Sequence, residues 1–245
     1  MLEAALAVVA ASTSSFARLG PSAPSQQPIS ASPLRGITIH LVRHAERPHN
    51  LRSIPEKERI DMLDPGLTEY GLAQCVLLSE RFHAMDKVTK ILASPLCRTL
   101  HTALVAFKPA IERGIQVVLY PDLRECGGGR CNTGTNIEDL LKDLFEIEED
   151  IQKDCVDASL CEPGWETGTE SLEKKDMRIQ RAERVLSMLY HLGKMSANAS
   201  DYDVEIVVVT HSRLILLLEG HTSGKFFLMS LDLFWIMAGF YLFGS

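Results

Sequence analysis

The chain of 245 residues has little of several features that would narrow its class. Its six cysteines form no Cys-x-x-Cys pair and no histidines follow them at finger-like spacing, which argues against a structural zinc site. Positive charge is scarce, with 25 Lys and Arg against 32 Asp and Glu, so we expect no nucleic-acid partner. Three consecutive glycines, 127–129, lack the Gly-Lys-Ser/Thr that completes a P-loop. A chain of this length does not need disulfides, so we expect reduced thiols and a cytoplasmic location.

The first 35 residues lack an apolar period and are rich in Ala, Ser and Pro. We interpret residues 1–35 as a disordered or targeting leader. An apolar octet, Ala4 to Ala11, is short enough for the core of a signal peptide, but no positive charge precedes it. A disordered extension is therefore our first interpretation, and organelle targeting or secretion stays open.

From residue 36 onward, short β-branched apolar runs alternate with segments of helical period. This alternation predicts an α/β fold, a three-layer sandwich with a mostly parallel sheet and helices on both faces, in one domain over residues 36–225. The predicted strands are 37–42, 90–93, 117–120 and 205–210. The predicted helices begin at the N-cap Thr68 and run through Arg81, run from Arg98 through Leu104, and cover 136–155 and 172–192.

Polar residues follow the predicted strands at the points where they end. Arg43 and His44 follow the first strand, Arg98 the second, Glu125 the third and His211 the fourth. Since parallel strands bring their carboxyl ends to one edge of the sheet, these side chains are expected to converge. Arginine clamps and a histidine nucleophile or base are suited to an anion site. Any one of these residues, taken alone, is also compatible with a structural or surface role.

The ordered set of motifs resembles the histidine phosphatase superfamily, with its phosphoglycerate mutase-like fold, and looks most similar to fungal-type phosphoglycerate mutase-like proteins. The resemblance covers roughly residues 37–212. The segments that carry it are Leu-Val-Arg-His-Ala-Glu (41–46), Asp-Pro-Gly-Leu-Thr-Glu-Tyr-Gly-Leu-Ala-Gln (64–74), Ile-Leu-Ala-Ser-Pro-Leu-Cys-Arg-Thr-Leu-His-Thr-Ala (91–103), Leu-Arg-Glu (123–125) and Val-Val-Val-Thr-His (207–211).

This resemblance implies a metal-independent phosphomonoester hydrolase that acts through a phosphohistidine intermediate and needs no cofactor. The substrate would be a small phosphorylated molecule. The implied catalytic residues are His44 as nucleophile, Glu125 as proton donor and His211; the implied phosphate-binding residues are Arg43, Asn50 and Arg98. A mutase-type phosphoryl transferase and a non-catalytic phosphate-binding relative are the alternatives.

The residues support this chemistry on their own terms. Arg43 and Arg98 can offer forked hydrogen bonds to phosphoryl oxygens. His44 must be neutral to attack phosphorus, and neighbouring cations disfavour its protonation. A protonated Glu125 can supply the proton that the leaving oxygen needs.

The sequence departs from the resemblance after His211. Arg213 stands where small residues are usual, where it would crowd the pocket or add a phosphate ligand. Residues 226–245 form an atypical apolar tail in which Asp232 is the one charge. A tail anchor over 226–243, which would make the membrane a partner, a replacement core helix and an error in the gene model are the alternatives. We favour the last because the change in sequence is abrupt.

Overall fold

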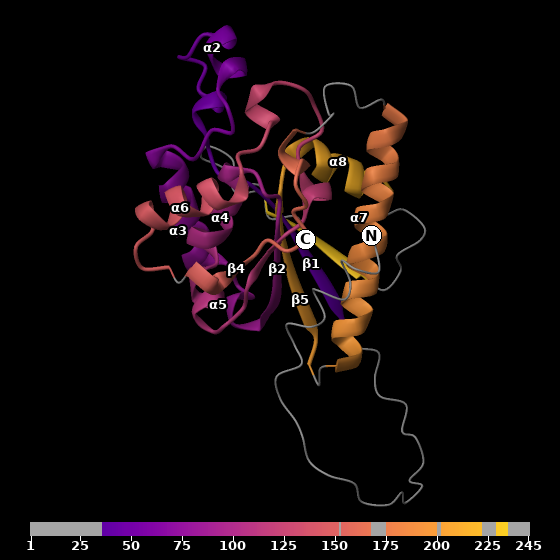
Figure 1. Ribbon diagram of the computed structural model, residues 1–245. Coiled ribbons are helices and arrows are strands. Elements are labelled where there is room, and N and C mark those ends of the chain that lie inside the picture. Colours follow the sequence, from indigo (N-terminus) through magenta and orange to yellow (C-terminus); the bar gives the residue numbers. More distant parts are fainter. Residues whose placement is uncertain (1–35, 152, 168–174, 200–201, 222–228, 235–245) are drawn as a thin grey trace, which may run out of the picture.

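The computed structural model describes residues 36–151, 153–167, 175–199, 202–221 and 229–234 (Figure 1). The expectations for the leader 1–35, and those for residues 226–228 and 235–245 of the tail, lie outside the described residues.

One six-stranded sheet forms the centre of the protein, and every strand pairing in it is parallel. The spatial order is β4-β3-β2-β5-β1-β6. The strands are β1 (Ile37–Arg43), β2 (Val88–Ala93), β3 (Val117–Leu119), β4 (Val156–Asp157), β5 (Val204–Thr210) and β6 (Met229–Phe234). The strands β2, β5 and β1 lie in the middle. Arg43 and His44 stand at the end of β1, Arg98 follows β2 and His211 follows β5, whereas Glu125 follows the neighbouring strand β3.

Helices cover both faces of the sheet, which confirms the three-layer α/β prediction (Figure 1). The longer helices are α2 (Glu56–Asp61), α3 (Glu69–Arg81), α4 (Cys97–Ala106), α5 (Lys108–Glu112), α6 (Ile137–Ile147), α7 (Lys175–Ala199) and α8 (Ser212–His221). The 3-10 helices are η1 (Pro48–Asn50), η2 (Met85–Lys87), η3 (Pro121–Leu123), η4 (Arg130–Asn132), η5 (Lys153–Cys155) and η6 (Trp165–Thr167). Helices α3 to α6 pack on one face, and α7 and α8 pack on the other.

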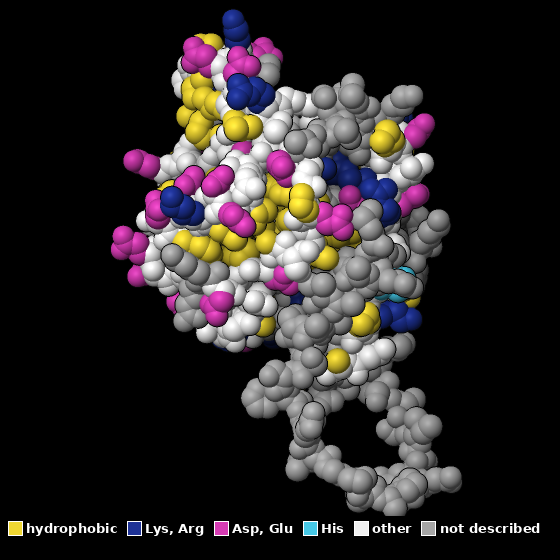
Figure 2. All heavy atoms as spheres, viewed as in Figure 1, with side chains coloured by type: hydrophobic (Ala, Val, Ile, Leu, Met, Phe, Trp, Pro, Cys, Tyr) yellow, Lys and Arg dark blue, Asp and Glu magenta, His cyan; other side chains and the backbone are white. Residues whose placement is uncertain are grey.

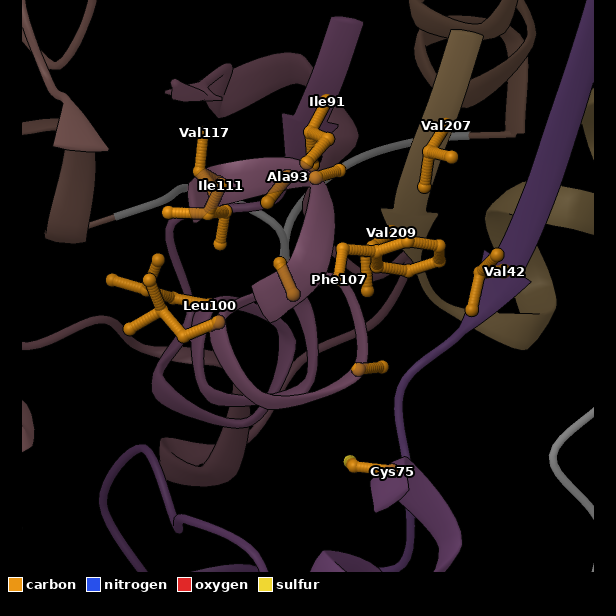
Figure 3. Packing of buried hydrophobic residues seen from close by; sticks show 14 of the residues in the cluster. Val42, Cys75, Ile91, Ala93, Leu100, Phe107, Ile111, Val117, Val207 and Val209 are labelled. Carbon is orange, nitrogen blue, oxygen red and sulfur yellow. The ribbon is translucent and has the colours of Figure 1, made fainter. Parts of the chain in front are cut away.

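The strands are apolar on both faces because both faces are covered. In β5, Val207 and Val209 pack toward α4 and its neighbours, whereas Ile206 and Val208 pack toward α7 and α8. This two-sided burial explains the continuous apolar runs in the sequence. Figure 3 shows the first of these cores, where strand residues face Leu100 of α4, Ile111 of α5 and Phe107 in the turn between these helices.

The predicted elements are present, with ends that differ by a few residues. Thr68 caps α3 as expected, because its side chain accepts a hydrogen bond from the Gly71 amide at 3.0 Å. The prediction over 136–155 was too long, since α6 ends at Ile147. The short elements α2, α5 and β4 were not predicted, because segments of two to six residues carry too little periodicity.

The tail segment 229–234 is a strand, so a replacement helix is wrong for these residues. It pairs in parallel with β1, with Met229 opposite Ile37 and Phe234 opposite Val42. Its sequence, Met-Ser-Leu-Asp-Leu-Phe, starts with the period-2 alternation typical of strands, which the surrounding apolar run obscures. Within the described ranges, none of the helices combines the length and apolarity that crossing a membrane requires.

Phe107 offers a test of the core between the sheet and α4. Its side chain is fully buried and meets the Phe82 ring edge-on, with 5.2 Å between ring centroids. We expect Phe107→Ala to lower the free energy of unfolding by about 3–5 kcal/mol, measured by urea denaturation, because it leaves a cavity. Ile147→Ala, whose side chain is 64% exposed, is the control and should change it by less than about 0.5 kcal/mol. Equal effects of the two changes would contradict this packing.

Candidate active site

A cleft of about 280 Å³ opens at the carboxyl edge of the sheet, beyond the ends of β1 and β5. Four of the six predicted site residues line it: Arg43, His44, Asn50 and Glu125. The other two, Arg98 and His211, are buried next to it and contact one another, and the ring centroid of His211 lies 5.2 Å from that of His44. The structure therefore brings all six residues to one place. The remaining lining residues are Arg47, Gly128, Cys131, Asn132, Ser212 and Arg213.

His44 is fixed by two hydrogen bonds to the backbone. Its amide donates to the Thr210 carbonyl at 3.0 Å, which joins the end of β1 to the end of β5. Its ring Nδ1 lies 2.7 Å from the Ala45 carbonyl oxygen. Because a carbonyl oxygen only accepts hydrogen bonds, Nδ1 must carry the proton. In the neutral ring, Nε2 is therefore the nitrogen with a free lone pair.

The pKa of His44 is held well below its ordinary value of 6.5, so the ring is neutral at neutral pH. Burial is the largest cause, and the positive charges of Arg98, Arg47 and Arg43 act in the same direction. The hydrogen bond to Ala45 opposes them. The sequence predicted a neutral ring held by two arginines, whereas burial and Arg47 contribute as well.

Arg98 lies at the second position of α4 and is completely buried. Its Nη1 donates to the Cys131 carbonyl at 2.9 Å, and its Nη2 donates to Asn132 Oδ1 at 3.0 Å. Burial lowers the pKa of Arg98 to about 9, so the group stays charged at neutral pH. Asp64 offsets the cost of burying this charge, with 3.8 Å between its Oδ1 and Arg98 Nη1.

Asp64 positions Arg98 by capping the helix from outside. Its Oδ1 accepts from the Cys97 amide at 3.0 Å and its Oδ2 accepts from the Thr135 amide at 3.1 Å. The N-cap residue of α4, Leu96, provides no side-chain bond. The carboxylate thus satisfies an amide that the helix itself leaves open, and it joins α4 to the 130–135 segment.

His211 is buried between Arg98 and Ser94. Arg98 Nη2 donates to His211 Nδ1 at 3.3 Å, since a guanidinium only donates. The proton of the neutral ring is therefore on Nε2, which lies 3.0 Å from Ser94 Oγ. The pKa of His211 is held well below 6.5, first by burial and then by Arg98 and His44. Both ring nitrogens are occupied, so a bond from His211 to a phosphoryl oxygen requires one partner to be exchanged.

Glu125 lies in a segment held from behind by α7. The buried Arg181 donates from Nη1 to the carbonyls of Asp122 and Arg124, at 3.0 and 2.6 Å, and its Nη2 lies 3.2 Å from Cys126 Sγ. Glu125 Oε1 accepts from the Cys126 amide at 2.8 Å. Held by these contacts, Glu125 is 8% exposed and lies on the wall of the cleft. Arg181 is a positioning residue that the helical pattern of the sequence did not reveal.

Arg47 is the main lining residue that the sequence analysis missed. It is 6% exposed, and its Nη1 donates to the Cys131 carbonyl at 3.4 Å. Asn50 Oδ1 accepts from the Arg47 amide at 3.2 Å and so fixes the turn of η1. The spacing of Arg47, three residues after His44, was the available signal.

The cleft is a basic island in an acidic protein of net charge -7. Figure 2 shows acidic side chains scattered over the region of α3 and α6, and Lys and Arg side chains gathered beside the upper part of α7. Burial lowers the pKa of Arg43, while the charge of Glu125 opposes the shift. No cluster of three or more His, Cys, Asp or Glu with metal-binding placement occurs among the described residues.

One protein family matches most of the chain. The family model of the histidine phosphatase superfamily (branch 1) matches residues 39–229, which is most of the chain and includes every site residue above. The chain belongs to the histidine phosphatase superfamily.

Individual proteins that are similar to this chain were also found. A probable phosphatase of Schizosaccharomyces pombe is 34% identical over 107 residues, 43% of this chain. The match spans 48%, about half, of that relative's length. The ecdysone phosphate phosphatase of Bombyx mori has 16% identity over 74% of both chains and a TM-score of 0.51, which shows a common fold. A phosphoglycerate mutase of Bacillus anthracis has 18% identity, covers 86% of this chain and 93% of its own, and has a TM-score of 0.48.

The two buried histidines of this superfamily member predict a loss of stability in acid. Folding lowers the pKa of both His44 and His211. Below about pH 6.5 these side chains are therefore protonated in the unfolded chain but stay neutral in the native protein. Above the unfolded pKa the two rings do not make the free energy of unfolding depend on pH. As the pH falls below it, the free energy of unfolding decreases by about 1.4 kcal/mol per pH unit for each ring. Urea midpoints between pH 7.5 and 5.5 should shift less in His44→Gln than in wild type. The exposed His191→Gln should retain the wild-type shift, and equal pH dependence in all three proteins would contradict the neutral rings.

Proposed function

We propose that the chain is a metal-independent phosphomonoester hydrolase that acts through a phosphohistidine intermediate on His44. The observation that carries the proposal is the neutral, buried ring whose Nδ1 proton is held by the Ala45 carbonyl. That bond directs the Nε2 lone pair to the reaction, and the surrounding arginines favour an anionic phosphoryl group.

The first half-reaction transfers the phosphoryl group to the ring. His44 Nε2 attacks phosphorus, the bond from phosphorus to the ester oxygen breaks, and the alcohol leaves. Glu125 Oε2 gives its proton to that oxygen, since Oε1 is held by the Cys126 amide. In the second half-reaction a water gives a proton to Glu125 and attacks phosphorus. The bond from phosphorus to nitrogen then breaks, its electrons return to Nε2, and inorganic phosphate leaves.

Arginine charge supports the metal-independent form of this chemistry. Arg43, Arg47 and Arg98 lie around His44 and lower its pKa, so they act on the position that the phosphoryl group would occupy. They would bind its equatorial oxygens as charge spreads over them in the transition state. In this proposal Arg98 exchanges a carbonyl partner for a phosphoryl oxygen, and His211 holds Arg98 in position.

The cleft volume of about 280 Å³ supports a small substrate, since it is near the lower end of the range for small-molecule sites. All six cysteines are free thiols, which supports a reducing, cytoplasmic location for the protein. A mutase is the second candidate of the same class, because it would use the same phosphohistidine and only a different acceptor.

The direct test is hydrolysis of p-nitrophenyl phosphate in excess EDTA. We expect full activity with the chelator and a loss of about 10³-fold or more in His44→Ala, because no other group replaces the nucleophile. His191→Ala, on the exposed face of α7, is the control and should keep wild-type activity. A folded wild type that is inactive, or one that EDTA inactivates, would contradict the proposal.

Glu125→Gln tests the proton donor by the choice of leaving group. Nitrophenolate leaves without a proton, so this variant should release about one equivalent per site in a burst and then turn over slowly, because the water lacks its base. An alkyl phosphate needs the acid in the first step, so its hydrolysis should fall by about 10²- to 10⁴-fold without a burst.

Stopped-flow absorbance measures the burst of nitrophenolate, and phosphate release measures the hydrolysis of the alkyl phosphate. Glu138→Gln, an exposed carboxylate of α6, is the matched control and should behave as wild type. Equal losses for both substrates in Glu125→Gln, with no burst, would remove Glu125 from the proton-transfer role.

A further inference from the structure

Arg213 lies on the cleft but stands apart from the arginines around His44. It is the second residue of α8, directly after the His211 and Ser212 pair, and its side chain lines the cleft. Arg47 and Arg98 are buried, whereas Arg213 is exposed to solvent at the rim. The pKa of His44 is lowered by Arg98, Arg47 and Arg43. The charge of Arg213 thus lies on the exposed side of the cleft, whereas those of Arg47 and Arg98 are buried.

A hydrogen bond to the backbone holds the Arg213 side chain at the rim of the cleft. Its Nη1 donates to the Cys126 carbonyl at 3.0 Å. A Cβ added to Gly127 would lie 2.5 Å from that nitrogen, and Gly127 has a φ of +153°, so glycine is what lets the guanidinium cross this segment. The side chain thus rests on the Glu125 segment, and its remaining donors are available to the cleft.

The charge of Arg213 has no counterion within the described part of the chain. Its one protein partner there is a backbone carbonyl, and it forms no ion pair with an Asp or Glu. Its position in the first turn of α8 adds the positive end of a helix dipole to the same spot. A guanidinium without an ion-pair partner among the described residues, beside a helix start and on the wall of a cleft of about 280 Å³, is suited to a second anion.

We propose that Arg213 is a specificity-determining residue, and that the substrate carries a second anionic group, a carboxylate or a phosphate, which Arg213 binds while the scissile phosphoryl group lies at His44. This inference rests on the proposed function. The cleft volume of about 280 Å³ limits the spacer between the two anionic groups to a few atoms. The substrate class is therefore a small phosphorylated acid or a compact bisphosphate.

Matched pairs of phosphomonoesters that differ only at the second group test the proposal. One pair is phosphoglycolate and 2-hydroxyethyl phosphate, and a longer pair is 3-phosphoglycerate and glycerol 3-phosphate. At constant ionic strength, we expect wild type to have a kcat/KM about tenfold higher for the carboxylate member of at least one pair, the size expected of one charge-assisted hydrogen bond. Arg213→Gln should reduce that ratio to about one, and Arg213→Lys should keep part of it.

Two further measurements separate the outcomes. Lys142→Gln removes one positive charge from the exposed surface of α6 and should keep the wild-type ratio. The same preparations are assayed with p-nitrophenyl phosphate, which has no second anionic group. Hydrolysis of this ester by wild type, together with ratios near one for both pairs, would overturn the role of Arg213 and leave the phosphatase standing.

An equal loss on both members of each pair in Arg213→Gln would also overturn it, because it would mean general electrostatic attraction of phosphate esters. A folded wild type that hydrolyses none of these esters would instead overturn the proposed function itself. The two failures are thus distinguishable from one set of rates.

Discussion

The buried guanidinium of Arg98 is the constraint on which the rest of the site depends. It joins three segments that are distant in the sequence: it donates to Cys131 and Asn132, it donates to His211, and it lies beside Asp64. A fully desolvated charge is costly unless it is paired and hydrogen-bonded. The need to hydrogen-bond this charge therefore favours one conformation of the surrounding loops. That conformation positions the residues that line the cleft.

The protonation states of His44 and His211 depend on the same charge of Arg98. Burial and the arginines keep His44 and His211 neutral, which is favourable for attack on phosphorus and unfavourable for stability in acid. The Ala45 carbonyl then decides which nitrogen of His44 is free. Cations around a neutral nucleophile favour the binding of an anion. The negative charge of a phosphoryl group would therefore be stabilised at this position.

The alternation of strands and helices predicted the architecture and the convergence of five site residues, whereas Asn50 was implied only by the family resemblance. Apolar runs covered on both sides are recognisable without a structure, and parallel strands must bring their carboxyl ends together. Strand β6 was missed because its alternation, Met229 to Phe234, is embedded in a longer apolar run. Short elements such as β4 have no period to detect.

The support around the site was not predictable in the same way. Arg181 and Asp64 act through contacts across 57 and 33 residues of sequence, to Arg124 and Cys97. Such contacts depend on which face of a helix meets which loop, and on side-chain conformations that residue spacing does not determine. The departure at Arg213 was visible in the sequence, but its meaning required the contact with Cys126.

The most direct test of this account is the chemical identity of the intermediate. The protein is mixed with p-nitrophenyl phosphate, quenched within milliseconds in alkali, where phosphohistidine survives, and analysed by peptide mass spectrometry and ³¹P NMR. The account predicts one phosphoryl group, on Nε2 of His44, because Nδ1 is held by the Ala45 carbonyl. Phosphorylation of Nδ1, of another residue, or of none during steady hydrolysis would contradict it.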